Sequence, residues 1–233
     1  MAEHTYKQFD AEMEELRSGV MAMGGLVETQ FARAIQSLRH PELDQVDMVA
    51  ADEQAINQMQ MAIDQQCSQI IAKRQPAAKD LRTILIVVKI VNELERIGDE
   101  VKKIAYKAQQ MQRPERLTAV RLHEIARAAE LAEDNLQLAL DAFARLDVNA
   151  AATVVSNDEA IDAAFLAILR QLISYMMEDP RTITPALEIV FIAKSIERIG
   201  DHAKNIAENV VHAVKGVDVR HATAEQIRAE VAD

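Results

Sequence analysis

Two pairs of acidic residues recur at the same spacing in this 233-residue chain and could hold a cation. Glu95 and Asp99 lie four residues apart, and so do Glu197 and Asp201. On a helix this spacing puts both carboxylates on one face, one turn apart, where like charges repel each other. The helical periodicity of the neighbouring apolar residues predicts that both pairs face away from the core, toward solvent or a partner. A bound cation would turn the repulsion into attraction.

Two further pairs at the same spacing could supply more oxygen ligands. Glu53 and Asn57 precede the first acidic pair, and Asp158 and Asp162 precede the second. If the helices that carry them are neighbours, clustered carboxylates from two helices could bind a hard or borderline cation. The predicted ligands are Glu53, Glu95 and Asp99 at one site and Asp158, Asp162, Glu197 and Asp201 at the other. Because Asn57 stands where the second set has Asp162, we expect the second site to bind more tightly.

The same acids could instead form a solvated face that binds no metal, since such pairs arise often in acidic helical proteins. Basic residues could then neutralise them, and the candidates are Arg96, Lys102, Arg198 and Lys204. Gly98 and Gly200 lie inside the two acidic pairs, although a glycine within a helix costs about 1 kcal/mol relative to alanine. A glycine in both copies indicates either a crowded site or the close packing of another helix.

No sequence motif for catalysis accompanies these acids. The chain contains no glycine-rich phosphate loop, nucleophile elbow or zinc-binding helix motif. None of its histidines follows a glutamate by three residues, as the motif of ferritin-like di-iron enzymes requires. His202 is the one histidine near the acidic pairs, and we expect it at the surface. We therefore predict no catalytic residue and no enzyme; the alternative is a carboxylate-bridged metalloenzyme or a metal-storage protein.

Long helices must position these pairs, and the prolines mark where such helices end, because proline is least tolerated inside a helix. The prolines are Pro41, Pro76, Pro114, Pro180 and Pro185. A further break is predicted near residues 146–149. Between the breaks, apolar residues recur every three or four positions, as on one face of a helix. The predicted helices span residues 5–39, 43–74, 78–110, 116–145, 148–178 and 183–214.

The acidic pairs belong to an internal repeat. Residues 94–105 read LERIGDEVKKIA and residues 196–207 read IERIGDHAKNIA, so eight of twelve positions are identical at an offset of 102 residues. A weaker match at an offset of 105 aligns Glu53 with Asp158. Short turns make neighbouring helices antiparallel. We therefore predict an all-α fold of six long antiparallel helices in two tandem, pseudo-symmetric three-helix bundles, residues 1–112 and 113–215, followed by a tail, 216–233.

The composition restricts the partners of the chain. Its 37 Asp and Glu residues outnumber its 26 Lys and Arg residues, and the net charge of −11 argues against binding to nucleic acid. The longest apolar run, residues 163–169, is far shorter than the roughly 20 residues of a membrane span, so we expect no membrane insertion. A single cysteine and an N-terminus unlike a signal peptide fit a cytoplasmic location.

The repeated pattern E-R-I-G-D-x-x-K-x-I-A resembles the PhoU family of phosphate-specific transport system accessory proteins. Supporting segments begin at Phe9, Met23 and Asp80, and the resemblance covers essentially the whole chain. It implies twin three-helix bundles, a fold that the repeats also predict, and a homodimer.

The resemblance also implies a function. PhoU proteins are cytoplasmic regulators that couple the high-affinity phosphate ABC transporter to a sensor histidine kinase. They repress phosphate uptake and the phosphate-starvation response when phosphate is plentiful. The implied partners are therefore the kinase, the transporter subunits and a second copy of the chain.

Some PhoU proteins carry multinuclear iron or zinc clusters on E(D)-x-x-x-D motifs. The pairs at positions 95 and 99, 158 and 162, and 197 and 201 match this motif, whereas Asn57 departs from it. The resemblance thus implies divalent or trivalent metal ions as cofactors: iron, zinc or another metal.

Overall fold

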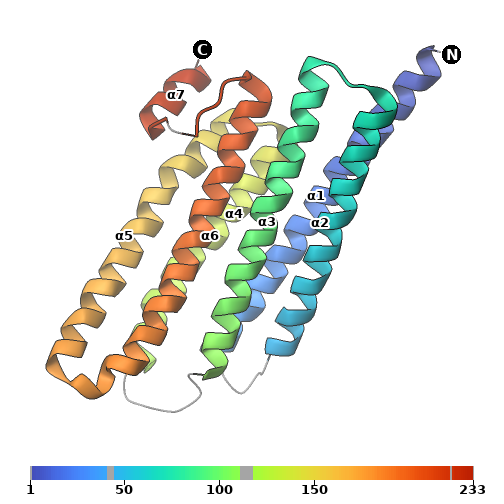
Figure 1. Cartoon of the computed structure of the whole chain (residues 1–233). Coiled ribbons are helices and arrows are strands. Elements are labelled where there is room, and N and C mark those ends of the chain that lie inside the picture. Colours follow the sequence, from blue (N-terminus) through green and yellow to red (C-terminus); the bar gives the residue numbers. More distant parts are fainter. Residues whose placement is uncertain (1, 41–44, 111–117, 221, 233) are drawn as a thin grey trace.

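Long antiparallel helices form two bundles that lie side by side in the computed structural model (Figure 1). The structure describes residues 2–40, 45–110, 118–220 and 222–232, and within them all regular secondary structure is helical. The first bundle contains α1 (Ala2–Arg39), α2 (Val46–Arg74) and α3 (Ala78–Gln110). The second contains α4 (Thr118–Arg145), α5 (Val148–Glu178) and α6 (Ile183–Lys215). A 3-10 turn, η1 (Pro180–Thr182), precedes α6, and a short helix, α7 (Ala224–Ala232), follows it.

The all-α fold of two helical bundles predicted from the repeats is confirmed. The predicted helix limits agree closely with those of α2, α3, α5 and α6. The predicted boundary between the units at residues 112 and 113, and the breaks at Pro41 and Pro114, lie outside the described residues.

Two helix ends show how local sequence sets the limits of the second bundle. Asp147 caps α5, because its side chain accepts hydrogen bonds from the backbone N–H groups of Asn149 and Ala150, at 2.9 and 3.1 Å. Leu146 has a φ of 52°, which turns the chain between α4 and α5. At the same end of the bundle α6 stops at Gly216 (Figure 1), whose φ of 80° lies in the left-handed region that glycine adopts without strain.

The apolar faces predicted from the periodicity are buried. In α3 the sequence-predicted face from Val87 to Ile104 packs into the core, and in α6 the corresponding face from Ile189 to Ile206 does the same. The buried side chains of the two bundles form one continuous cluster. α3 and α6 pack against each other in the middle of the molecule (Figure 1), so the two repeats share a long seam, and α1 also contacts α4.

The same internal symmetry is visible in buried polar contacts. Gln30 Nε2 donates to the backbone oxygen of Val49 at 3.1 Å, and Asn135 Nδ2 donates to that of Val154 at 3.2 Å. Gln30 corresponds to Asn135, and Val49 to Val154, at the offset of 105 residues. The first and second helices of each bundle are therefore joined by an equivalent hydrogen bond.

The outer face of α5 and the start of α6 expose large apolar side chains. They are Leu166, Ile173, Met177, Ile183, Leu187 and Phe191. Among the described helices α5 alone is long and apolar enough to cross a membrane, a test of length and composition that core helices also pass, and only 17% of its apolar window is buried within the chain. One such helix does not by itself indicate membrane insertion.

Candidate functional site

The structure brings the predicted acids of the first repeat together across α2 and α3. Glu95 and Asp99 lie one turn apart on α3, and Glu53 approaches them from α2. Burial raises the pKa of Glu95, and the negative charges of Asp99 and Glu53 raise it further. The expectation that the second and third helices of each unit are neighbours is therefore correct for this bundle.

The second repeat builds a larger cluster of four carboxylates. Asp158 and Asp162 come from α5, and Glu197 and Asp201 come from α6. Burial raises the pKa of Asp201, and the charges of Glu197, Asp158 and Asp162 add to this effect. The pKa of Asp162 is raised by burial and then by Asp158 and Glu197. The four side chains therefore share one electrostatic environment.

The acids of the second cluster are less exposed than the sequence predicts. The side chain of Glu197 is only 12% exposed and that of Asp158 only 4%. The expectation that the α6 pair faces away from the core is therefore wrong for Glu197. The reason is that α5 packs beside it, so this side of α6 lies at a boundary between two helices.

In each cluster a lysine of the third helix pairs with an acid of the second helix. Lys102 Nζ lies 2.9 Å from Glu53 Oε2, and Lys204 Nζ lies 2.8 Å from Asp158 Oδ2. From the sequence, these lysines are candidates to neutralise Asp99 and Asp201, which lie three residues before them on the same helix. A third lysine, Lys194, lies 2.5 Å from Glu197 and had not been identified from the sequence.

The two clusters differ in one carboxylate oxygen. In the first, Asn57 Nδ2 donates to Glu53 Oε1 at 3.2 Å, so both oxygens of Glu53 have a partner. In the second, Asp158 Oδ1 is buried without any hydrogen-bond partner. A buried carboxylate oxygen without a donor is costly, and a cation would satisfy it. The second cluster therefore fits a metal ion better than the first.

A metal ion would nevertheless require side chains to move. Within the described part of the chain, no three or more His, Cys, Asp or Glu side chains are placed to hold one metal ion as they stand. A cation at the second cluster would have to compete with Lys204 for Asp158 or draw the acids together by side-chain rotation. Metal binding by these seven residues stays a prediction.

The repeated glycines allow the close packing of the neighbouring helix. A Cβ atom at Gly200 would lie 2.8 Å from Ile161 Cδ1, and one at Gly98 would lie 3.3 Å from Ile56 Cδ1. Ile56 and Ile161 are themselves related by the offset of 105 residues. Of the two interpretations of these glycines, close helix packing is thus directly supported; the Gly200 position also lies 3.5 Å from Asp158 Oδ1.

The seam between α3 and α6 contains a polar network that sequence reasoning missed. His202 is buried, and its Nδ1 lies 2.7 Å from Glu93 Oε2, so the expected surface role of this histidine is wrong. Ser195 donates to Glu100 at 2.9 Å. At the offset of 102 residues, Glu93 corresponds to Ser195 and Glu100 corresponds to His202. The contact of Glu93 with His202 is therefore the symmetry equivalent of the contact of Ser195 with Glu100. The offset is the sequence signal that could have revealed this network, because it places Glu93 and Ser195 at equivalent positions of the repeat, and likewise Glu100 and His202.

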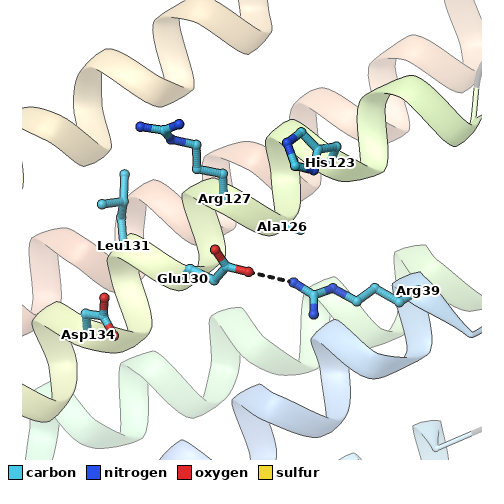
Figure 2. A pocket seen from close by; sticks show the side chains of 7 residues that line it. All are labelled: Arg39, His123, Ala126, Arg127, Glu130, Leu131 and Asp134. Carbon is cyan, nitrogen blue, oxygen red and sulfur yellow. Dashed lines mark hydrogen bonds and ion pairs between the residues drawn. The ribbon is translucent and has the colours of Figure 1, made fainter.

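A separate groove lies between α1 and α4 (Figure 2). It has a volume of about 550 Å³. Arg39 reaches across from α1 to Glu130 of α4, at 3.0 Å, and His123 and Arg127 lie along the same helix as Glu130. The exposed ion pair links the two bundles at their surface, and this groove contains none of the sequence-predicted site residues.

The fold and the acidic clusters define a tandem-repeat helical protein with one carboxylate cluster in each repeat. The family model described as PhoU domain matches residues 20–108 and 125–210. The chain therefore belongs to the PhoU family.

Relatives and solved structures match over nearly the full chain. A protein of Pseudomonas putida named phosphate-specific transport system accessory protein PhoU homolog is 44% identical over 99% of this chain and 90% of its own length. The phosphate-specific transport system accessory protein PhoU of Escherichia coli K12 is 41% identical over 96% of this chain and 92% of its own length.

Among solved structures, that of PhoU from Pseudomonas aeruginosa superimposes with a TM-score of 0.84, at 43% identity, and covers 90% of this chain and 100% of that one. The phosphate transport system regulatory protein PhoU from Streptococcus pneumoniae gives a TM-score of 0.83 at 26% identity, covering 91% of this chain and 99% of that one.

Proposed function

We propose that this protein is a cytoplasmic regulator of phosphate homeostasis that represses phosphate uptake and the phosphate-starvation response. It would do so by coupling the phosphate ABC transporter to a sensor histidine kinase. The observation that carries the proposal is the match over nearly the full length to relatives named as accessory or regulatory proteins of phosphate transport. Such names describe regulators rather than enzymes, and they support this function over a metalloenzyme or a metal store.

A deletion strain tests the regulatory function. Cells that lack the protein should express alkaline phosphatase in high phosphate, and a plasmid copy of the gene should restore repression. Normal repression in the deletion strain, with no second copy of the gene in the genome, would contradict the proposal.

We also propose that the protein acts as a symmetric homodimer. The apolar side chains exposed on α5 and α6 support this, because an apolar surface of this kind is favoured at contacts between subunits. Light scattering at micromolar concentration should give twice the mass of the 25.9 kDa chain. A monomer mass at that concentration would contradict the dimer.

A metal-binding role at the second cluster is a further proposal, supported by the unpartnered Asp158 Oδ1 and the raised pKa values of Asp162 and Asp201. Iron and zinc are the first metals to test. A metal present at a hundredfold excess over its Kd should stabilise the folded protein by about 2.7 kcal/mol. The double variant Glu197→Gln/Asp201→Asn should lose both the bound metal and this stabilisation.

The matched control is the equivalent double variant of the first repeat, Glu95→Gln/Asp99→Asn. It should retain the tighter site and most of the stabilisation. Metal content and melting temperature after metal loading give two independent measurements. Equal stabilisation of the wild type and the Glu197→Gln/Asp201→Asn variant would reject the site.

A further inference from the structure

Two grooves along the seam between α3 and α6 are related by the internal repeat. The larger, which we name the Lys89 groove, has a volume of about 580 Å³ and is lined by Lys89, Glu93 and Arg96 of α3 and by Asn205 and Asn209 of α6. The smaller, the Lys107 groove, has a volume of about 340 Å³. At the offset of 102 residues, every residue that lines the Lys107 groove corresponds to one that lines the Lys89 groove or the pocket next to it.

In the Lys107 groove every cationic side chain has an acidic partner. Lys107 Nζ lies 2.6 Å from Glu188. Lys103 and Arg198 both lie 2.9 Å from the buried carboxylate of Glu100. Lys194 also lines this groove and forms an ion pair with Glu197 on the same helix. Each positive charge of this groove is therefore balanced by a carboxylate of the protein itself.

The Lys89 groove differs because two of its cations, Lys89 and Arg96, lack such partners. Among the described residues, the side chains of Lys89 and Arg96 form neither a hydrogen bond nor an ion pair. Asn209 is buried beside them, and its Nδ2 donates to the backbone oxygen of Asn205 at 2.8 Å. Asn209 Oδ1, by contrast, is buried without a partner. The groove thus contains the unpaired N–H donors of Lys89 and Arg96 together with one unsatisfied acceptor, Asn209 Oδ1.

The chain beyond α6 adds an ion pair to the same groove. Arg220 lines it and forms an ion pair with Asp218 at 2.5 Å. Burial lowers the pKa of His212, and the charges of Lys89, Arg82 and Arg220 lower it further against the opposing effect of Asp218. Arg82 Nε is itself buried without a partner. Lys89, Arg82 and Arg220 therefore all lie close enough to His212 to lower its pKa, in a chain whose net charge is −11.

Two carboxyl groups also line the groove, and the positive charge of Arg96 helps to lower the pKa of Glu93. The carboxylate of Glu93 also accepts hydrogen bonds from two side chains of α6, His202 at 2.7 Å and Asn205 at 3.0 Å. Burial raises the pKa of Glu208 to about 7, so this group is partly uncharged near neutral pH. The cations of the groove that form no hydrogen bond or ion pair within the described residues are Lys89 and Arg96.

From this arrangement we infer that the Lys89 groove binds a phosphate-class oxyanion, either free or as a phosphomonoester. Lys89 and Arg96 donate to its oxygens, since charge-assisted hydrogen bonds of this kind are the strong ones. A protonated oxygen or a hydroxyl of the ligand can satisfy Asn209. The groove has more volume than one tetrahedral anion needs, so an organic group attached to the phosphate also fits.

Calorimetric titration of the purified full chain tests the site. Inorganic phosphate and adenosine monophosphate are titrated separately at constant ionic strength, with a chelator present so that no metal ion in the acidic clusters can bind them. Saturable binding of inorganic phosphate identifies the free anion as sufficient. Binding of the monophosphate alone identifies a phosphomonoester site. Absence of saturable binding for both ligands at millimolar concentration overturns the inference.

Variants locate the site. Arg96→Gln and Lys89→Gln should each weaken binding about tenfold, which is the effect of losing one charge-assisted hydrogen bond. Both side chains lack partners, so both variants should keep the wild-type melting temperature without ligand. The matched control is Arg198→Gln, at the position equivalent to Arg96 in the Lys107 groove, and it should bind as the wild type does. Equal affinities of Arg96→Gln and the wild type, or equal losses in Arg96→Gln and Arg198→Gln, would place binding elsewhere.

Discussion

Lys204 lies 2.8 Å from one oxygen of Asp158, while the other oxygen of the same carboxylate is buried with no partner. The equivalent pair in the first repeat, Lys102 and Glu53, has the same geometry at 2.9 Å, but there Asn57 satisfies the second oxygen. The two repeats thus share an ion pair between their second and third helices and differ in how completely the acid is satisfied. We therefore expect the stability of the second repeat to depend more strongly on its lysine than that of the first.

Replacing each lysine tests that difference. Lys204→Met should lower the free energy of unfolding by about 1–2 kcal/mol, because it leaves the buried Asp158 carboxylate with neither oxygen paired. Lys102→Met should cost less, because Asn57 still donates to Glu53. Urea denaturation of both variants measures the two values. An equal or larger loss in Lys102→Met would show that Asn57 does not compensate.

The glycines of the repeated motif should respond differently to alanine. At Gly200 the new Cβ would lie 2.8 Å from Ile161, so Gly200→Ala should destabilise the fold by about 1–3 kcal/mol through overpacking. At Gly98 the contact of 3.3 Å is milder, and the gain in helix propensity should offset much of the strain. Thermal unfolding compares the two.

Gly25→Ala is the control for propensity alone, since nothing lies within 4 Å of a Cβ placed there on α1. It should stabilise the protein by about 0.5–1 kcal/mol. If Gly200→Ala were as stable as Gly25→Ala, the close packing against Ile161 would not be the reason for a glycine at that position.

Glu208 should make stability depend on pH. Its pKa is raised to about 7 by burial, so the folded state binds this proton more tightly than the unfolded state does. Stability should therefore fall as pH rises from about 4.5 to about 7 and then stay lower. Glu208→Gln should match the wild type near pH 4.5 and exceed it at pH 8 by up to about 3 kcal/mol, since one pKa unit corresponds to about 1.4 kcal/mol. Melting curves at both pH values check this, and a wild type more stable than the variant at pH 8 would contradict it.

Glu93 should show the opposite dependence. Burial would raise its pKa, but the hydrogen bonds from His202 and Asn205 outweigh burial and lower it. The stabilisation that the ionised carboxylate gives is therefore fully present above pH 4.5 and is lost as pH falls through the lowered pKa. The stability difference between the wild type and Glu93→Gln should be largest near neutral pH and should shrink below pH 4.5. A difference that does not change with pH would show that the charge of Glu93 contributes nothing.

The sequence by itself determined the helices, their limits and the duplication. Pro76 and Pro180 end helical patterns because proline fits poorly inside a helix, and the periodic apolar residues of α3 and α6 identify the faces that become buried. These properties depend on residues close together in the chain. The expectation for the acids was conditional on the second and third helices of each unit being neighbours, and these helices do pack against each other in both units.

Only the tertiary structure decided which charged groups meet. Lys204 pairs with Asp158 on the neighbouring helix rather than with Asp201 on its own, and His202 is buried against Glu93 of the other repeat. Such contacts depend on the rotation and the axial position of one packed helix relative to another. A shift of one residue turns a side chain by about 100° around the helix axis, so periodicity along one helix cannot specify the partner that packing brings from another.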